Sequence, residues 1–236
     1  MEKNDRINKR KRIPRAKVKL ELEVWKMGQL VCGVDEVGRG CLAGPVVTSA
    51  VVLHAGKRFE LLKDSKLLSK EQRVRAAKWI KQHSWYAYGI VSHSEIDRYN
   101  IYQATMRAMK RAVMHVISQM TCLPARIIVD AMPLKLDGWL NDIEIMYFPE
   151  AEQASVSVAA ASILAKEKRD ELMNVYGRIF PGYALAQHKG YATSTHRKLV
   201  QQEGRSIIHR VTFLKNFNEI LEEHYEQQIE LFSGSD

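Results

Sequence analysis

The chain has 236 residues, of which 46% are hydrophobic and 27% charged, with a formal net charge of +9. This length suits one globular domain with a small appendage, and the composition excludes an intrinsically disordered chain. The longest nearly apolar stretch, residues 156–165, is too short for a membrane span, and no secretory signal pattern follows the basic N-terminus. We therefore expect a cytoplasmic protein without membrane association. Its three cysteines form no CxxC pair and are expected to be reduced thiols.

Basic residues are concentrated at the N-terminus. Residues 1–19 hold nine Lys or Arg side chains against two carboxylates, so the rest of the chain is nearly neutral. Such an arm is typical of nucleic-acid binding, because each neutralised phosphate releases counterions. A solvated tail that only keeps the protein soluble is the alternative. We assign residues 1–28 to a flexible basic arm whose role stays open.

The body of the chain alternates strand and helix patterns. Strands are predicted at residues 29–34, 45–53, 85–91, 126–130 and 143–148, and helices at residues 69–83, 95–119 and 154–176. Three glycines in residues 37–44 predict a tight connection between the first two strands. The order predicts an α/β domain over residues 29–215, with a mixed five-stranded sheet flanked by helices and a helical tail at residues 216–236.

Carboxylates stand where two predicted strands end. Asp35 and Asp130 close the first and fourth strands, and ligand sites of open α/β sheets lie outside the carboxyl ends of strands. Glu36 is a third acid, and Glu150 or Glu152 a fourth. Several converging carboxylates are the ligands that Mg²⁺ or Mn²⁺ require in a two-metal site. Spacing alone does not establish convergence, because an aspartate at a strand end is also a common turn or cap residue.

Three histidines are candidates for metal binding or acid–base catalysis. Their sequence settings do not have the spacing of zinc ligands, so we assign structural roles or transient nucleic-acid contacts to His188, His196 and His209. Ser162 and Lys166 lie four residues apart on one predicted helix face. They could contact a nucleic-acid backbone, and a cap or surface role is equally open.

Several segments together resemble the type 2 ribonuclease H family, the bacterial ribonuclease HII proteins. The resemblance extends over about residues 30–213, and its blocks follow the family's order. The first block, residues 33–45, reads GVDEVGRGCLAGP; the others are residues 64–69, 96–109, 129–130, 161–170, 180–183 and 187–193.

The resemblance implies a ribonuclease H-like fold and a metal-dependent endonuclease. Its substrates would be RNA/DNA hybrids and duplex DNA containing single ribonucleotides, cut to 3′-hydroxyl and 5′-phosphate ends. Asp35, Glu36 and Asp130 would bind two Mg²⁺ or Mn²⁺ ions. The fourth family acid, usually an aspartate, corresponds to Glu152 here, and the neighbouring Glu150 is the alternative.

The resemblance also implies how the substrate sugar is recognised. The loop Gly38, Arg39 and Gly40 would approach the 2′-hydroxyl that distinguishes RNA from DNA. Tyr191 would pack on the following deoxyribose, and Lys66 would contact a phosphate. From the residues alone, a half-buried packing tyrosine and a solvated surface lysine are the simpler interpretations.

This chain departs from the family pattern at several points. Cys41 replaces a common proline, Ala131 replaces a glycine, and residues 205–213 lack the usual proline. None of these changes removes a proposed catalytic atom. Competing interpretations are a nucleic-acid-binding protein and another metal-dependent nuclease of the same fold. We expect a monomer, while the preferred ion and any protein partner, such as a replication clamp, stay open.

Overall fold

The computed structural model describes residues 16–136, 138–140 and 143–214. The predicted tail at residues 216–236 and the first fifteen residues of the predicted arm lie outside this part. The strands are β1 (Val31–Val37), β2 (Val46–Leu53), β3 (Ser84–Val91), β4 (Arg126–Asp130) and β5 (Glu144–Phe148). The α-helices are α1 (Lys19–Lys26), α2 (Lys70–Gln82), α3 (His93–Ile117), α4 (Ala151–Ala154), α5 (Val156–Ile179), α6 (Leu185–His188) and α7 (Ser194–Glu203), and the short 3₁₀ helices are η1 (Ser65–Leu67), η2 (Gly138–Leu140) and η3 (Pro181–Tyr183).

The sheet is mixed and five-stranded, as the sequence predicts. Its strand order is β3-β2-β1-β4-β5; β1 pairs antiparallel with β2, and β2 with β3, whereas β1 pairs parallel with β4, and β4 with β5. The register Val34↔Val129 brings the carboxyl ends of β1 and β4 together. Asp130, one residue further along, ends β4 as predicted. Asp35 does not end its strand as predicted, because pairing with β2 continues β1 to Val37.

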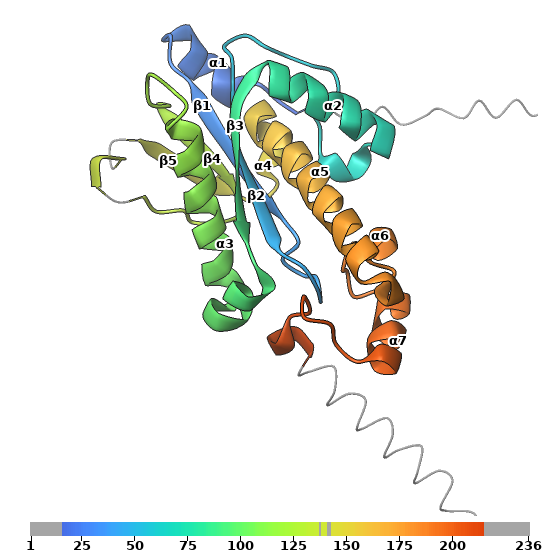
Figure 1. The fold of residues 1–236 in the computed structure, drawn as a ribbon. Coiled ribbons are helices and arrows are strands. Elements are labelled where there is room, and N and C mark those ends of the chain that lie inside the picture. The colour runs from blue at the N-terminus through green and yellow to red at the C-terminus, as the bar shows by residue number, and fades with distance from the viewer. Residues whose placement is uncertain (1–15, 137, 141–142, 215–236) are drawn as a thin grey trace, which may run out of the picture.

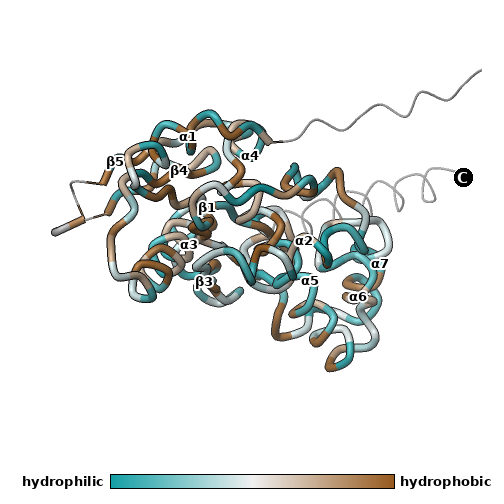
Figure 2. The backbone as a smooth tube through the Cα atoms, turned by 90° about the horizontal axis from the view of Figure 1, so that it is seen from above, coloured by the Kyte–Doolittle hydropathy of each residue, from teal (hydrophilic) through white to brown (hydrophobic). Residues whose placement is uncertain are grey.

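Helices cover both faces of the sheet. Helix α3 packs on one face, and α5 with α2 packs on the other, while α6 and α7 continue beyond the end of α5 (Figure 1). Hydrophobic and hydrophilic residues alternate along these helices (Figure 2), as expected of helices that bury one face. None of the helices in the described part of the chain combines the length and apolar character needed to cross a bilayer.

Helix α5 approaches the sheet closely because its first half carries small residues. Ala159, Ala160 and Ala161 are fully buried against it. Gly33 in β1 allows this approach, since a Cβ atom there would lie 2.1 Å from the backbone carbon of Ser157. The close approach brings Ser162, on the same helix, to the carboxyl end of β1.

The last part of the predicted arm is packed against the domain. Helix α1 buries Val24 and the Glu21 carboxylate. Glu21 accepts hydrogen bonds from the Ser157 backbone N–H at 3.1 Å and from the Ser155 hydroxyl, at the start of α5. Helix α1, which lies inside the predicted arm of residues 1–28, is therefore joined to the domain, because an acid inside the basic segment caps a helix of the domain.

Ala131 has a backbone conformation that favours glycine. It follows Asp130 with a φ of 52°, in the left-handed region that costs a residue with a Cβ atom about 1 kcal/mol. We expect Ala131→Gly to raise the free energy of unfolding by about 0.5 kcal/mol, because the relieved strain exceeds the added entropy of the unfolded chain. Thermal unfolding measures this. The control is Ala186→Gly in α6, which should lower stability, and a loss of stability in both variants would contradict the interpretation.

Candidate active site

Four acids gather where β1 and β4 end and α4 begins. Asp35 and Glu36 belong to β1, Asp130 ends β4, and Glu152 lies in the one-turn helix α4. Asp35 and Glu152 are buried, at 7% and 6% exposure. The Ala151 backbone N–H donates to the Asp130 carboxylate at 3.0 Å and thereby fixes α4 beside β4.

These acids act on one another electrostatically. Burial raises the pKa of Asp35 well above its ordinary value, and the charges of Glu36 and Asp130 raise it further. Burial also raises the pKa of Glu36, where Arg39 opposes the shift and Asp130 adds to it. The pKa of Glu152 is likewise raised by burial, and then by the charge of Asp130. The four carboxylates therefore place negative charges close together in a site that is largely shielded from water.

The chemistry of these donors fits a hard divalent cation. All are carboxylate oxygens, the ligand type that Mg²⁺ and Mn²⁺ prefer. Oε2 of Glu36 and Oε2 of Glu152 are buried without a hydrogen-bond partner among the described residues, an arrangement that costs free energy unless a cation or water compensates. Within the described residues, no three His, Cys, Asp or Glu side chains already stand in the arrangement of a metal site.

The two alternatives for the fourth acid differ in position. Glu152 is buried and feels the charges of Asp130, Asp64 and Lys66. Glu150 precedes α4 in a left-handed conformation, with a φ of 59°, and is exposed. Asp64 is a further acid near Glu152 that strand-end position did not indicate. Its carboxylate accepts the Lys66 backbone N–H at 2.9 Å and begins η1.

The glycine loop between β1 and β2 presents its carbonyl groups to the protein interior. The guanidinium of Arg210 donates to the carbonyls of Gly38 and Arg39, each at 2.7 Å. In the described part of the chain, the backbone N–H groups of Gly38, Arg39 and Gly40 donate to no protein acceptor. Gly38 has a φ of 96°, and a Cβ there would lie 2.1 Å from Nε of Arg169. The loop thus runs from buried Gly38 to exposed Gly40 with backbone N–H groups that have no partner among the described residues.

Tyr191 lies against this loop. It forms an isolated bridge with Cys41, and the Leu42 backbone N–H donates to the Gly190 carbonyl at 2.8 Å. The Tyr191 side chain is 38% exposed. The predicted residues Gly38, Arg39, Gly40 and Tyr191 are therefore brought together, beside the end of the strand that carries Asp35 and Glu36.

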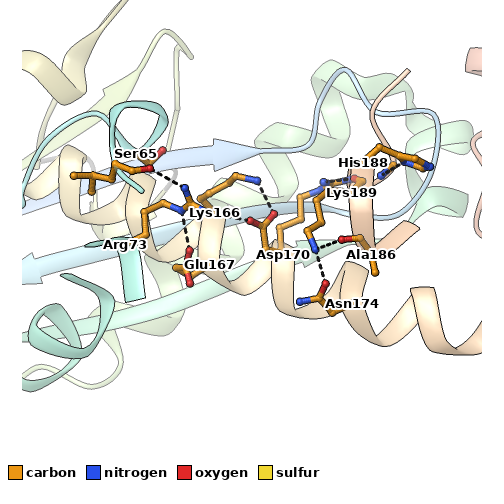
Figure 3. Close-up of polar contacts among 12 residues, drawn as sticks. Ser65, Arg73, Lys166, Glu167, Asp170, Asn174, Ala186, His188 and Lys189 are labelled. Carbon is orange, nitrogen blue, oxygen red and sulfur yellow. Dashed lines mark hydrogen bonds and ion pairs between the residues drawn. The ribbon is translucent and has the colours of Figure 1, made fainter. Parts of the chain in front are cut away.

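Lys66 and Lys166 occupy different settings. Lys66 is exposed in η1, which is attached to α5 by the Ser65 hydroxyl at 3.0 Å from the Ser162 hydroxyl. Ser162 is buried and hydrogen-bonds Asp35, which lowers the pKa of that carboxyl. Nζ of Lys166 pairs with Asp170 at 2.5 Å in a row of polar contacts along α5 (Figure 3). Ser162 is thus a partner of the acid group, a role that the helical spacing alone could not specify.

The three histidines lie together in the structure, although their spacing in the sequence is not that of zinc ligands. The ring of His196 stacks on that of His188 at 4.1 Å between centroids, and its Nε2 lies 3.1 Å from Nε2 of His209. Nδ1 of His196 lies 2.9 Å from the Tyr191 carbonyl. His196 and His209 therefore form a buried hydrogen-bonded pair joined to the Tyr191 carbonyl, and the half-buried ring of His188 stacks on His196.

His196 and His209 make the stability of the folded protein depend on pH. Burial lowers the pKa of both His196 and His209 to about 4, well below the ordinary value of 6.5. Between pH 6.5 and pH 4 the unfolded chain binds protons at these histidines that the folded protein does not bind. The free energy of unfolding therefore falls as the pH drops through this range. From about pH 7 to about pH 5, each should lower the free energy of unfolding by about 2 kcal/mol.

Thermal unfolding of the wild type and of His209→Gln across that range isolates the effect. The buried acids act in the opposite direction, because their raised pKa values favour the folded state as pH falls. The difference between the two proteins cancels that contribution. We expect the variant to lose less stability on acidification, and parallel pH profiles would contradict the assignment.

Comparisons with known proteins show the family to which the chain is similar. A family model described as Ribonuclease HII matches residues 32–216. The chain is 43% identical over 185 residues to a ribonuclease HII of Staphylococcus epidermidis, covering 78% of this chain and 69% of that protein. It is 39% identical over 195 residues to a ribonuclease HII of Thermus thermophilus, covering 82% of this chain and 91% of that protein.

Solved structures show the same fold. The ribonuclease HII in a complex with PCNA from Archaeoglobus fulgidus superposes with a TM-score of 0.63 at 23% identity, covering 77% of this chain and 94% of that one. The Bst ribonuclease HIII solved in complex with Mn²⁺ gives a TM-score of 0.57 at 23% identity, covering 78% of this chain and 67% of that one.

Proposed function

The chain belongs to the ribonuclease HII family and is a nuclease with ribonuclease H activity, and from this premise we propose that it also incises duplex DNA at single embedded ribonucleotides. The observation that carries the proposal is the position of the glycine loop, whose free N–H donors and neighbouring Tyr191 stand beside the acids of β1. Those donors are suited to a sugar hydroxyl, the group that separates RNA from DNA.

We propose that Asp35, Glu36, Asp130 and Glu152 hold two Mg²⁺ or Mn²⁺ ions. The Mn²⁺ complex of the Bst ribonuclease HIII supports divalent metal use in this fold. Divalent ions bound there would supply an activated water and stabilise the leaving 3′ oxygen, giving 3′-hydroxyl and 5′-phosphate ends. The unpartnered buried oxygens of Glu36 and Glu152 support these assignments, because an ion would relieve their burial.

The remaining residues would select and orient the substrate. Gly38, Arg39 and Gly40 would contact the ribose, and the partly exposed ring of Tyr191 would pack on the next deoxyribose. The exposed ammonium of Lys66, on η1 beside the acid group, would contact a phosphate. These residues come from different segments, so the proposed specificity depends on how firmly those segments are joined.

Cleavage of a labelled DNA duplex with one ribonucleotide tests the proposal. We expect incision on the 5′ side of that ribonucleotide with Mg²⁺ or Mn²⁺, and none with EDTA or on an all-DNA duplex. Cutting of a long RNA/DNA hybrid without incision at the single ribonucleotide would limit the protein to hybrids. Cutting of the all-DNA duplex would contradict the sugar-reading role of the loop.

A further inference from the structure

The dipeptide His209–Arg210 lies buried between the two halves of the proposed sugar-reading site. His209 is 1% exposed and Arg210 is 0% exposed. Their segment follows α7 and returns to the ends of β1 and β2 (Figure 1). Backbone contacts hold it there: His209 forms an isolated bridge with Ala43, and the Arg210 N–H donates to the Leu42 carbonyl at 2.8 Å.

Arg210 fixes the glycine loop through its planar guanidinium. Besides the carbonyls of Gly38 and Arg39, it reaches the carbonyl of Gly44 at 2.9 Å, so it spans both ends of the loop. Burial lowers the pKa of Arg210 to about 10, which leaves it charged at neutral pH. Within the described residues it forms no ion pair with a carboxylate. Its side-chain hydrogen bonds go to carbonyl oxygens, its Cζ lies 5.1 Å from the centroid of the Phe213 ring, and the charge of Asp97 acts on it without a direct ion pair. Burying a charge without a direct ionic partner is costly, which suggests a role beyond stability.

His209 fixes the tyrosine side of the site through His196. The Tyr191 carbonyl can only accept, so Nδ1 of His196 carries the proton and its Nε2 accepts. The Ser206 backbone N–H donates to Nδ1 of His209 at 3.0 Å, so Nε2 of His209 carries the proton and donates to His196. The Tyr191 carbonyl at one end and the Ser206 N–H at the other therefore require the same order of donors and acceptors along the two rings. Each ring is therefore a neutral, fixed tautomer.

We propose that His209–Arg210 is a positioning element that sets the glycine loop and Tyr191 relative to each other. The inference rests on the proposed function, in which these two parts contact adjacent sugars. The dipeptide is buried and acts through its neighbours rather than by touching substrate. A single ribonucleotide offers one productive register, whereas a long hybrid offers many. Loss of the fixed spacing should therefore impair incision at a single ribonucleotide much more than cleavage of a long hybrid.

The variants Arg210→Lys and His209→Leu test the inference. Lysine keeps the charge but lacks the fork that reaches three carbonyls, and leucine removes the donor to His196. We expect kcat/KM on the single-ribonucleotide duplex to fall about tenfold or more, mainly through KM, with a much smaller change on a long hybrid. His209→Gln, which retains an amide donor, should recover part of the loss.

A remote destabilised variant separates positioning from folding. Ile80→Ala removes a fully buried side chain in α2 and should lower the melting temperature without changing the ratio of the two kcat/KM values. Ring ¹⁵N resonances of the wild type should identify His196 as protonated at Nδ1 and His209 at Nε2. Opposite tautomers would overturn the hydrogen-bond chain.

The failures are distinguishable. The wild-type rate on the single-ribonucleotide duplex tests the proposed function by itself, and its absence would remove that function together with the inference that depends on it. When the wild type does incise this duplex, an unchanged substrate ratio in both Arg210→Lys and His209→Leu overturns the positioning role alone.

Discussion

Replacing Asp35 by asparagine is expected to reduce incision by about 10³-fold or more while making the metal-free protein more stable. The activity would fall because Asp35 is one of the carboxylates proposed to hold the ions, and bound ions would contribute several kcal/mol to stabilising the transition state. Stability would rise because the buried Asp35 charge lies beside those of Glu36 and Asp130. Asparagine removes that charge and keeps an oxygen that can accept the Glu36 backbone N–H, now bonded at 2.7 Å.

Two measurements test the expected combination of lower activity and higher stability. Thermal unfolding in EDTA should show a gain of about 1 kcal/mol, or about 2–4 °C, for Asp35→Asn. Adding Mn²⁺ should raise the melting temperature of the wild type more than that of the variant, because the ion binds the folded state. A variant less stable than the wild type in EDTA would contradict the repulsion among the acids. Retained incision would remove Asp35 from the proposed metal site.

Local patterns predicted the sheet and its main helices because their signals lie within short segments. The helix predicted over residues 69–83 is α2, which a capping box of Ser69 and Gln72 begins. Residues 126–130 form β4 with the predicted bounds. Helix α3 contains an interruption at Asn100, with a φ of 64°, that helical periodicity did not indicate. The Asn100 side chain accepts the Gln103 backbone N–H at 3.1 Å and so caps the following part of the helix, a local contact that leaves no period in the sequence.

The candidate site was predictable only in part, for the same physical reason. Strand-end position selected Asp35 and Asp130, and the family resemblance supplied Tyr191. Nothing local marked Arg210, which lies 172 residues from the Gly38 carbonyl that it contacts. Contacts between residues so far apart in the sequence depend on how the chain returns to the sheet. The structure therefore reveals these contacts, whereas the spacing of residues in the sequence does not.

The fourth acid can be identified with two matched variants. Glu152→Gln is expected to lower kcat by about 10²-fold or more, because it removes a buried carboxylate from the group around Asp130. Glu150→Gln changes an exposed side chain two residues away and should leave kcat nearly unchanged. Both substitutions remove one charge and preserve shape, so they differ only in the position of the side chain. Single-turnover incision of the single-ribonucleotide duplex with saturating Mn²⁺ is the measurement.

A third variant tests whether charge or length matters at this position. Glu152→Asp restores the acid that is usual in the family and should keep far more activity than Glu152→Gln, because a carboxylate on the short helix α4 can still approach an ion held by Asp130. If Glu150→Gln were the damaging change and Glu152→Gln were tolerated, the assignment would reverse. The buried Glu152 oxygen would then be a structural group whose unpartnered state requires another explanation. If both were tolerated, three acids would suffice, and the proposed two-ion arrangement would lose a ligand from α4.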